Sequence, residues 1–451
     1  MFGQVLTIAR NTFVESIRQP VFFVLVLAGG LLQVVNTALS AFSMGMTEQT
    51  EVFGDDKLLL DMGLATVMVC ATLLAAFIAT SVLSREIENK TALTVISKPV
   101  GRPVFIIGKY LGVTGAILVA TVILSVFFMF AIRHRVMSTA RDTLDGPVLL
   151  FSILSVLIPV ALAVWGNFFY GWVFSSTAIG AMLPATLIAF VLTLAISKEW
   201  AIQPLSKDFK PQITIAVACA GAAILVLTAA AVAASTRLGQ VMTLVVCCGL
   251  FVLGLLSNHL LGRFAFTNPV IGVIKQVEID PQADFRQPGA TATITLDQPA
   301  REPITVGASL FFGPNPSGVG LLVPAHRPFE GDPTSEAQVI RRGTPPALAV
   351  RTVTKTGESE AYTLVNVGGI RVGRAPRAGD FIFTGPTRSN WLARGAWSLV
   401  PNLQTFWLVD AITQGHTIPA RYLGLVLAYA GVQITAFLAL AVLLFQRRDV
   451  G

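Results

Sequence analysis

The sequence predicts an α-helical polytopic membrane protein of about eight transmembrane helices with an inserted extracytoplasmic β-rich domain. Of its 451 residues, 54% are hydrophobic and only 13% are charged, whereas about 25% are charged in a typical soluble domain. The mean hydropathy is +0.71. The apolar residues form eight long runs without Asp, Glu, Lys or Arg, and one long polar region separates the last two runs.

Each apolar run is long enough to cross a bilayer, because about 20 helical residues span the hydrocarbon core of about 30 Å. The predicted spans are Val21–Ser43, Met62–Ser84, Leu111–Ile132, Pro147–Phe169, Thr177–Ser197, Ile213–Ala234, Val241–Leu261 and Tyr422–Phe445. An even number of spans places both termini on the same side of the membrane.

Lys and Arg near the span ends set the orientation. If the termini are cytoplasmic, the inner segments hold ten basic residues and the short outer loops hold seven. The first loops differ most, because the inner one carries five basic residues and the outer one has Lys57 among Glu48, Glu51, Asp55 and Asp56. We therefore expect both termini in the cytoplasm.

The first twenty residues predict an interfacial helix that precedes the first span. Apolar residues recur there at steps of three and four, and charged or polar residues fill the positions between them. Such a segment can lie along the headgroup plane before Pro20 leads into the membrane. A slightly helical tail is the simpler alternative.

Residues 263–421 differ in composition from the rest of the chain and predict a β-sandwich or barrel-like domain. The candidate strands are Val270–Asp280, Ala290–Asp297, Ile304–Phe312, Ala347–Thr354, Tyr362–Arg374 and Phe381–Thr384. Because this domain follows an odd number of spans, we expect it outside the cytoplasm. The predicted organisation is therefore 1–20, the elbow helix; 21–262, seven spans; 263–421, the β-rich domain; and 422–451, the last span and tail.

Charge and motifs exclude several function classes. The net charge of +7 comes mostly from membrane-proximal loops, where anionic lipid explains it, so we expect no nucleic acid partner. We find no catalytic constellation, no cofactor motif and no metal-ligand spacing. A Walker A loop is missing, because Tyr110 follows Gly108 and Lys109 where a hydroxyl residue is required.

Ion-coupled transport usually needs an ionisable side chain within the membrane. The eight predicted spans contain no Asp, Glu, Lys or Arg, and the nearest titratable group is His259 at the outer end of the seventh span. The pattern therefore disfavours a secondary transporter, although sodium sites built from carbonyl and hydroxyl oxygens remain open.

The loop at 85–110, between the second and third spans, concentrates charge. Arg85, Glu86, Glu88 and Lys90 stand at helical spacings of three and four residues and can brace a helix end. An apolar patch follows before Pro99 stops the helix. Such a segment suits docking of a partner, and it equally suits an ordinary charged loop that obeys the positive-inside rule.

Seven short motifs lie around this loop and near the two ends of the chain. They are RNTFVE at 10–15, RQP at 18–20, EIENKT at 86–91, SKPVGR at 97–102, GKYLG at 108–112, VPNLQTF at 400–406 and FQRRD at 445–449. Their order resembles the permease subunits of ABC-2 type exporters. The chain departs from the common six-span pattern of that family by an additional hairpin and by the β-rich insertion.

The resemblance implies a function. In that family the loop between the second and third spans carries a coupling helix that docks on a separate ABC ATPase. The residues that would make this contact are Arg85, Glu86, Glu88, Lys90, Thr91, Lys98, Pro99 and Arg102. The resemblance also implies a transport subunit rather than an enzyme, a homodimer or heterodimer of permeases, and a place in the bacterial cytoplasmic membrane.

Two other functions remain open on the residues alone. The chain could be a membrane anchor that presents its β-rich domain to a partner, in which case any other anchor would replace its spans. It could also be an ion-coupled secondary transporter, in which case uptake would follow a proton or sodium gradient without ATP.

Overall fold

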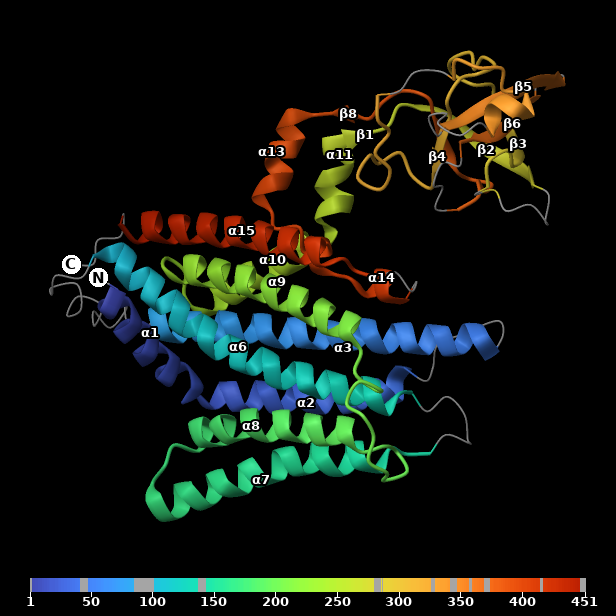
Figure 1. Ribbon diagram of the computed structural model, residues 1–451. Coiled ribbons are helices and arrows are strands. Elements are labelled where there is room, and N and C mark those ends of the chain that lie inside the picture. Colours follow the sequence, from blue (N-terminus) through green and yellow to red (C-terminus); the bar gives the residue numbers. More distant parts are fainter. Residues whose placement is uncertain are drawn as a thin grey trace. The chain divides into compact units, whose positions relative to one another are not determined.

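The computed structural model describes residues 2–446 apart from 41–47, 85–100, 137–142, 280–284, 286, 326–328, 341–346, 357–358, 369–373 and 414–416. The chain forms two compact units (Figure 1). The helical unit comprises Met1–Leu255 and Pro401–Gly451, and the second unit comprises Leu256–Val400. Residues 401–421, which composition groups with the β-rich region, are thus part of the helical unit.

Within the described residues, eight helices are long and apolar enough to cross a membrane, as the sequence predicts. The helical unit contains α1 (Phe2–Ile17), α2 (Pro20–Leu39), α3 (Glu48–Ala79) with the π-helical turn η2 (Thr80–Ser84), α6 (Arg102–His134), α7 (Gly146–Tyr170), α8 (Phe174–Ala195), α9 (Pro211–Ser235), most of α10 (Gln240–Ser257), η4 (Leu403–Phe406), α14 (Val409–Thr413) and α15 (Ala420–Gln446). Gly171 ends α7 with φ +67°, which allows the tight turn into α8.

Several helices extend beyond the apolar runs and carry charged residues into the bundle. Helix α6 begins at Arg102, nine residues before the predicted span, and Lys109 within it is only 4% exposed. Helix α3 likewise includes Asp61 before its apolar part. The predicted spans themselves contain no Asp, Glu, Lys or Arg, but the helices that include them do, because hydropathy marks the apolar stretch of a helix and not its ends.

Three helices form the interior of the helical unit. In α3, α6 and α9 most residues of the apolar segment are buried. In α7, α10 and α15 most residues of the apolar segment are not buried. Large exposed side chains such as Leu157, Val245 and Val432 lie on these outer helices. In a bilayer such a surface faces hydrocarbon, which a water-soluble fold could not tolerate.

Helix α1 confirms the predicted N-terminal helix but packs on α6 through an unexpected face. Thr12 and Ser16 are buried, while the apolar side chains Phe2 and Leu6 are exposed. Two glycines of α6 make the close approach possible. A Cβ added at Gly108 would lie 2.8 Å from the Ile8 side chain, and one at Gly112 would lie 2.5 Å from the Ala9 carbonyl oxygen. The placement of α1 at the membrane surface stays a prediction.

We expect Gly112→Ala to destabilise the contact between α1 and α6 by about 1–3 kcal/mol, as overpacking usually does. The new methyl group would meet Ala9 backbone and Thr12 at 2.5 Å. Gly221→Ala in α9 is the control, because nothing lies within 4 Å of its Cβ and alanine stabilises a helix relative to glycine. Unfolding in mixed detergent measures both, and equal stability of the two variants would contradict this packing.

The second unit contains η3 (Asn258–Gly262), α11 (Arg263–Ala265), β1 (Phe266–Thr267), β2 (Val270–Ile279), β3 (Thr291–Leu296), β4 (Phe311–Gly313), α12 (Glu336–Val339), β5 (Ala347–Thr356), β6 (Ser359–Val367), β7 (Phe381–Phe383), β8 (Arg388–Ser389) and α13 (Trp391–Leu399). Six strands form one antiparallel sheet in the order β4-β7-β2-β3-β6-β5, and β1 pairs with β8.

The six-stranded sheet closes on itself. Leu310 N donates to Leu348 O at 2.8 Å, and Val350 N donates to Ala308 O at 3.0 Å, so the residues just before β4 pair with β5 at the other edge. The sheet therefore has the barrel-like form that the sequence allows. Strand β4 covers only Phe311–Gly313, whereas the sequence predicts a longer strand over Ile304–Phe312.

A buried core and one ion pair stabilise this unit. Ile294, Leu364 and Ile382 are fully buried inside the sheet. Arg374 donates to both carboxylate oxygens of Asp380, at 2.7 and 2.5 Å. The hydrogen bond to Asp380 raises the pKa of the Arg374 guanidinium, so this cation keeps its charge at any accessible pH.

Candidate functional site

Most of the predicted ATPase-contacting residues lie outside the described residues. Arg85, Glu86, Glu88, Lys90, Thr91, Lys98 and Pro99 all fall within 85–100. The structure does describe the two ends of this loop, at Ser84 and at Arg102. Arg102 is the first residue of α6 and donates from Nη1 to the carbonyl oxygen of Gln446 at 2.7 Å.

Both ends of the loop are attached to other helices. Ser84 Oγ donates to Leu238 O at 3.3 Å in the turn between α9 and α10. Arg237, in the same turn, donates from Nε to Leu444 O of α15 at 2.9 Å. We call the group formed by Ser84, Arg102, Arg237, Leu238, Leu444 and Gln446 the Arg102 end of the helical unit. It joins α3, α6, α9 and α15 at one end of the bundle (Figure 1).

The end of α15 explains why two arginines converge on it. The last carbonyl groups of a helix have no partner within the helix and carry partial negative charge. Arg102 and Arg237 satisfy two of them, and the rings of Phe105 and Phe445 stack beside them with centroids 5.6 Å apart. From the sequence, Arg237 is only a positive charge near a span end, whereas Arg102 is also a predicted contact of the ATPase.

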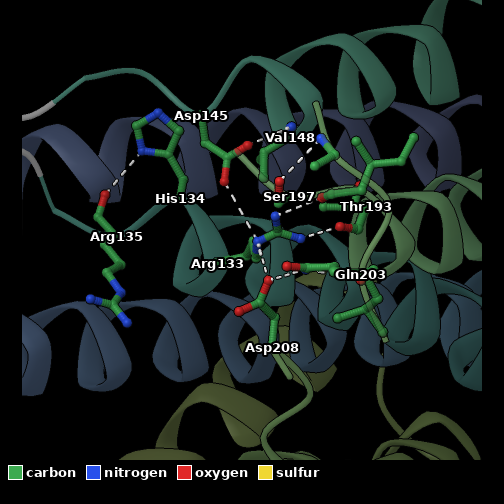
Figure 2. A network of polar contacts seen from close by, with 12 residues as sticks. Arg133, His134, Arg135, Asp145, Val148, Thr193, Ser197, Gln203 and Asp208 are labelled. Carbon is green, nitrogen blue, oxygen red and sulfur yellow. Dashed lines mark hydrogen bonds and ion pairs between the residues drawn. The ribbon is translucent and has the colours of Figure 1, made fainter. Parts of the chain in front are cut away.

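The opposite end of α6 carries a buried polar cluster, which we call the Arg133 cluster (Figure 2). Arg133 Nε lies 3.5 Å from Asp145 Oδ2 and 3.2 Å from Asp208 Oδ2. Its Nη2 donates to Ile196 O at 2.9 Å, and its Nη1 donates to Thr193 O. One guanidinium thus links the end of α6, the start of α7, the end of α8 and the segment before α9.

The carboxylates of the cluster have further partners. Asp145 caps α7, because its Oδ1 accepts from Val148 N at 3.2 Å. Gln203 Nε2 donates to Asp208 Oδ2 (Figure 2). The side chains of Arg133 and Asp145 are only 8% and 4% exposed. A buried charge is costly unless it is paired and hydrogen-bonded. Separating any of these four segments would leave a buried charge or a buried carbonyl group without its partner, so the cluster holds them together.

Sequence reasoning missed this cluster, because its members come from separate loops and Arg133 resembles an ordinary loop cation. One signal was present. Asp145 precedes Gly146-Pro147 at the start of an apolar run, and Asp followed by Pro marks a helix start. Within the described ranges, no three His, Cys, Asp or Glu residues are placed to hold a metal ion, and the cluster contains no nucleophile.

One family model matches the N-terminal part of the chain. Residues 6–170 match the model of the ABC-2 family transporter proteins. This ABC-2 segment includes α1, α2, α3, α6 and α7, and therefore contains the loop after η2, Arg102, Arg133 and Asp145. The resemblance predicted from the motifs is confirmed over this part of the chain. No curated protein and no solved structure matches the sequence.

The ABC-2 segment supports a permease subunit of an ABC transporter rather than an enzyme. Permeases of this family generally work with an ABC ATPase. With eight apolar helices, the match supports a multi-pass membrane protein. The β-rich unit lies beyond the matched residues.

Proposed function

We propose that this chain is the membrane-spanning subunit of an ATP-driven ABC-2 type exporter and that a separate ATPase drives it through the loop at 85–110. The observation that carries the proposal is the path of α6. This one helix begins at Arg102, within the predicted loop, and ends at the Arg133 cluster. At 1.5 Å per residue its 33 residues measure about 50 Å.

A rigid helix of that length can transmit motion between two ends of a bundle. At the Arg102 end, displacement of the loop would pull on α6 directly and on α15 through the Gln446 carbonyl. At the other end, Arg133 would transfer the displacement to α7, to α8 and to the segment holding Asp208. The discrete hydrogen-bonding arrangement favours switching between two states over gradual bending.

The orientation follows from the same proposal. The Arg102 end would face the cytoplasm, with both termini, and the Arg133 cluster would lie at the outer surface. The second unit would then be extracytoplasmic, since it follows the seventh candidate span. We further propose a dimer of permeases in the bacterial cytoplasmic membrane, as the family resemblance implies.

Reversing the charge of Glu86 and Glu88 tests the partner. We expect Glu86→Lys and Glu88→Lys together to abolish co-purification of the ATPase while membrane insertion is unchanged, because charge reversal in an interface usually costs several kcal/mol. The matched control is Glu199→Lys, in the loop between α8 and α9. If the ATPase still co-purifies with the double variant, this loop is not the docking site.

A further inference from the structure

An apolar groove runs along the side of the helical unit, between α2 and α7. Residues 26–37 of α2 and 148–157 of α7 form its walls, and residues 127–134 of α6 with Met182 of α8 form its floor. Its volume is about 300 Å³. The walls are partly open, because Leu31 is 64% and Ile153 is 53% exposed. The groove therefore opens sideways, between two candidate membrane spans.

The polar side chains in the groove have partners within the protein. Gln33 Nε2 donates to Gly63 O at 2.8 Å, and the hydroxyls of Thr37 and Ser152 donate to carbonyls of their own helices. A ligand of this groove would meet hydrocarbon along nearly all its length. A polar solute would lose its water shell there without gaining hydrogen bonds, so the occupant is apolar.

The dimensions separate the two apolar occupants that a membrane offers. A membrane-spanning helix of a second copy would lie along the whole hydrocarbon core of about 30 Å, whereas the groove follows only about 16 Å of α2, at 1.5 Å per residue. An acyl chain fits this length better. The length of about 16 Å is half of a hydrocarbon core of about 30 Å, which corresponds to one leaflet.

One end of the groove is polar. His134 lines it there, next to the Arg133 cluster, and its Nδ1 lies 3.0 Å from the Arg135 carbonyl oxygen (Figure 2). Since a carbonyl only accepts, Nδ1 carries the proton and donates. Nε2 of the ring is then the atom available to a headgroup. The apolar length and the polar end together match an amphiphile.

We infer that the groove between α2 and α7 is a binding site for one acyl chain of a bilayer phospholipid, whose headgroup lies at His134. The inference goes beyond the proposed function and does not require the ATPase. The acyl-chain site can therefore be refuted while ATPase docking is confirmed, and ATPase docking can be refuted while the acyl-chain site is confirmed. If both hold, the groove places an acylated amphiphile beside the moving end of α6.

A photoreactive lipid tests the site. The purified full chain is placed in nanodiscs containing phosphatidylglycerol with a diazirine midway along one acyl chain, irradiated, and digested for mass spectrometry. We expect the labelled residues to concentrate at 26–37 and 148–157 and to be fewer on the exposed face of α10, which has no groove residues.

Two variants fill the groove from opposite walls. Ser152→Trp and Val34→Trp should each reduce groove labelling to the level of α10, because an indole replaces the acyl chain. Leu154→Trp is the control, since Leu154 is exposed on α7 and does not line the groove. Size-exclusion profiles and circular dichroism show whether each variant is folded. Even labelling of α2, α7 and α10, or unchanged groove labelling in both folded variants, would overturn the inference.

Discussion

Replacing Arg133 by alanine should destabilise the helical unit by about 3–5 kcal/mol, because removing one partner of a buried ion pair leaves the other charge uncompensated. Asp145 would keep a buried negative charge, at 4% side-chain exposure. The carbonyl groups of Thr193 and Ile196 would also lose their donors. The Arg133 side chain joins four segments.

The same cluster predicts a rescue. Arg133→Met combined with Asp145→Asn and Asp208→Asn should recover most of the lost stability, because neutral partners remove the buried charges and asparagine also caps a helix well. The measurement is the free energy of unfolding in mixed detergent. Arg135→Ala is the control, since Arg135 is exposed two residues later and surface substitutions usually stay within about 0.5 kcal/mol. If Arg133→Ala lowers the free energy of unfolding as little as Arg135→Ala does, the cluster does not stabilise the helical unit.

Replacing both Arg102 and Arg237 by alanine should weaken the transmission of loop movement to α15 without unfolding the helical unit. Each cation at the end of α15 is worth only about 0.3–1 kcal/mol, which is too little to unfold a domain. Arg102 and Arg237 donate the hydrogen bonds that link α6 and the turn after α9 to the last turn of α15, beside the stacked rings of Phe105 and Phe445.

Hydrogen exchange provides the readout for this pair. In complex with the ATPase, addition of ATP should change exchange in residues 193–208 and in the last turn of α15 of the wild-type chain. In the double variant the change in α15 should shrink, while the change in 193–208, which α6 transmits, and co-purification should persist. The single variants measure whether the two arginines act together, since a departure from additivity reports their coupling. If ATP changes exchange in the last turn of α15 equally in the double variant, the two arginines do not carry the displacement to that helix.

The parts of the fold that depend on local pattern could be predicted from the sequence. Eight apolar runs identify the eight candidate spans, because the length and hydropathy of a run are enough to show that it can cross a membrane. The strands β2, β3, β5 and β7 follow from β-branched runs bounded by turn residues. Gly171 is a similar local signal for the turn between α7 and α8, because glycine readily adopts the positive φ that this turn has in the structure.

The parts that depend on contacts between distant residues could not be predicted. Hydropathy gives no reason to extend α6 back to Arg102, because charged residues at a helix end lower the local average. The closure of the sheet joins residues 307–310 to β5 across some forty residues of sequence. Arg133 and Arg237 have the composition of loop cations, and only packing distinguishes an anchoring arginine from a solvated one.

The most direct test of the central claim is photo-cross-linking in intact cells from residue 88, within the loop that the account assigns to the ATPase. A benzoylphenylalanine replacing Glu88 should cross-link to a protein that contains a Walker A motif. The same group replacing Arg135, at the other end of α6, should not. Cross-linking of the ATPase at 135, or its absence at 88 in a chain that still co-purifies with the ATPase, would contradict entry of force through this loop.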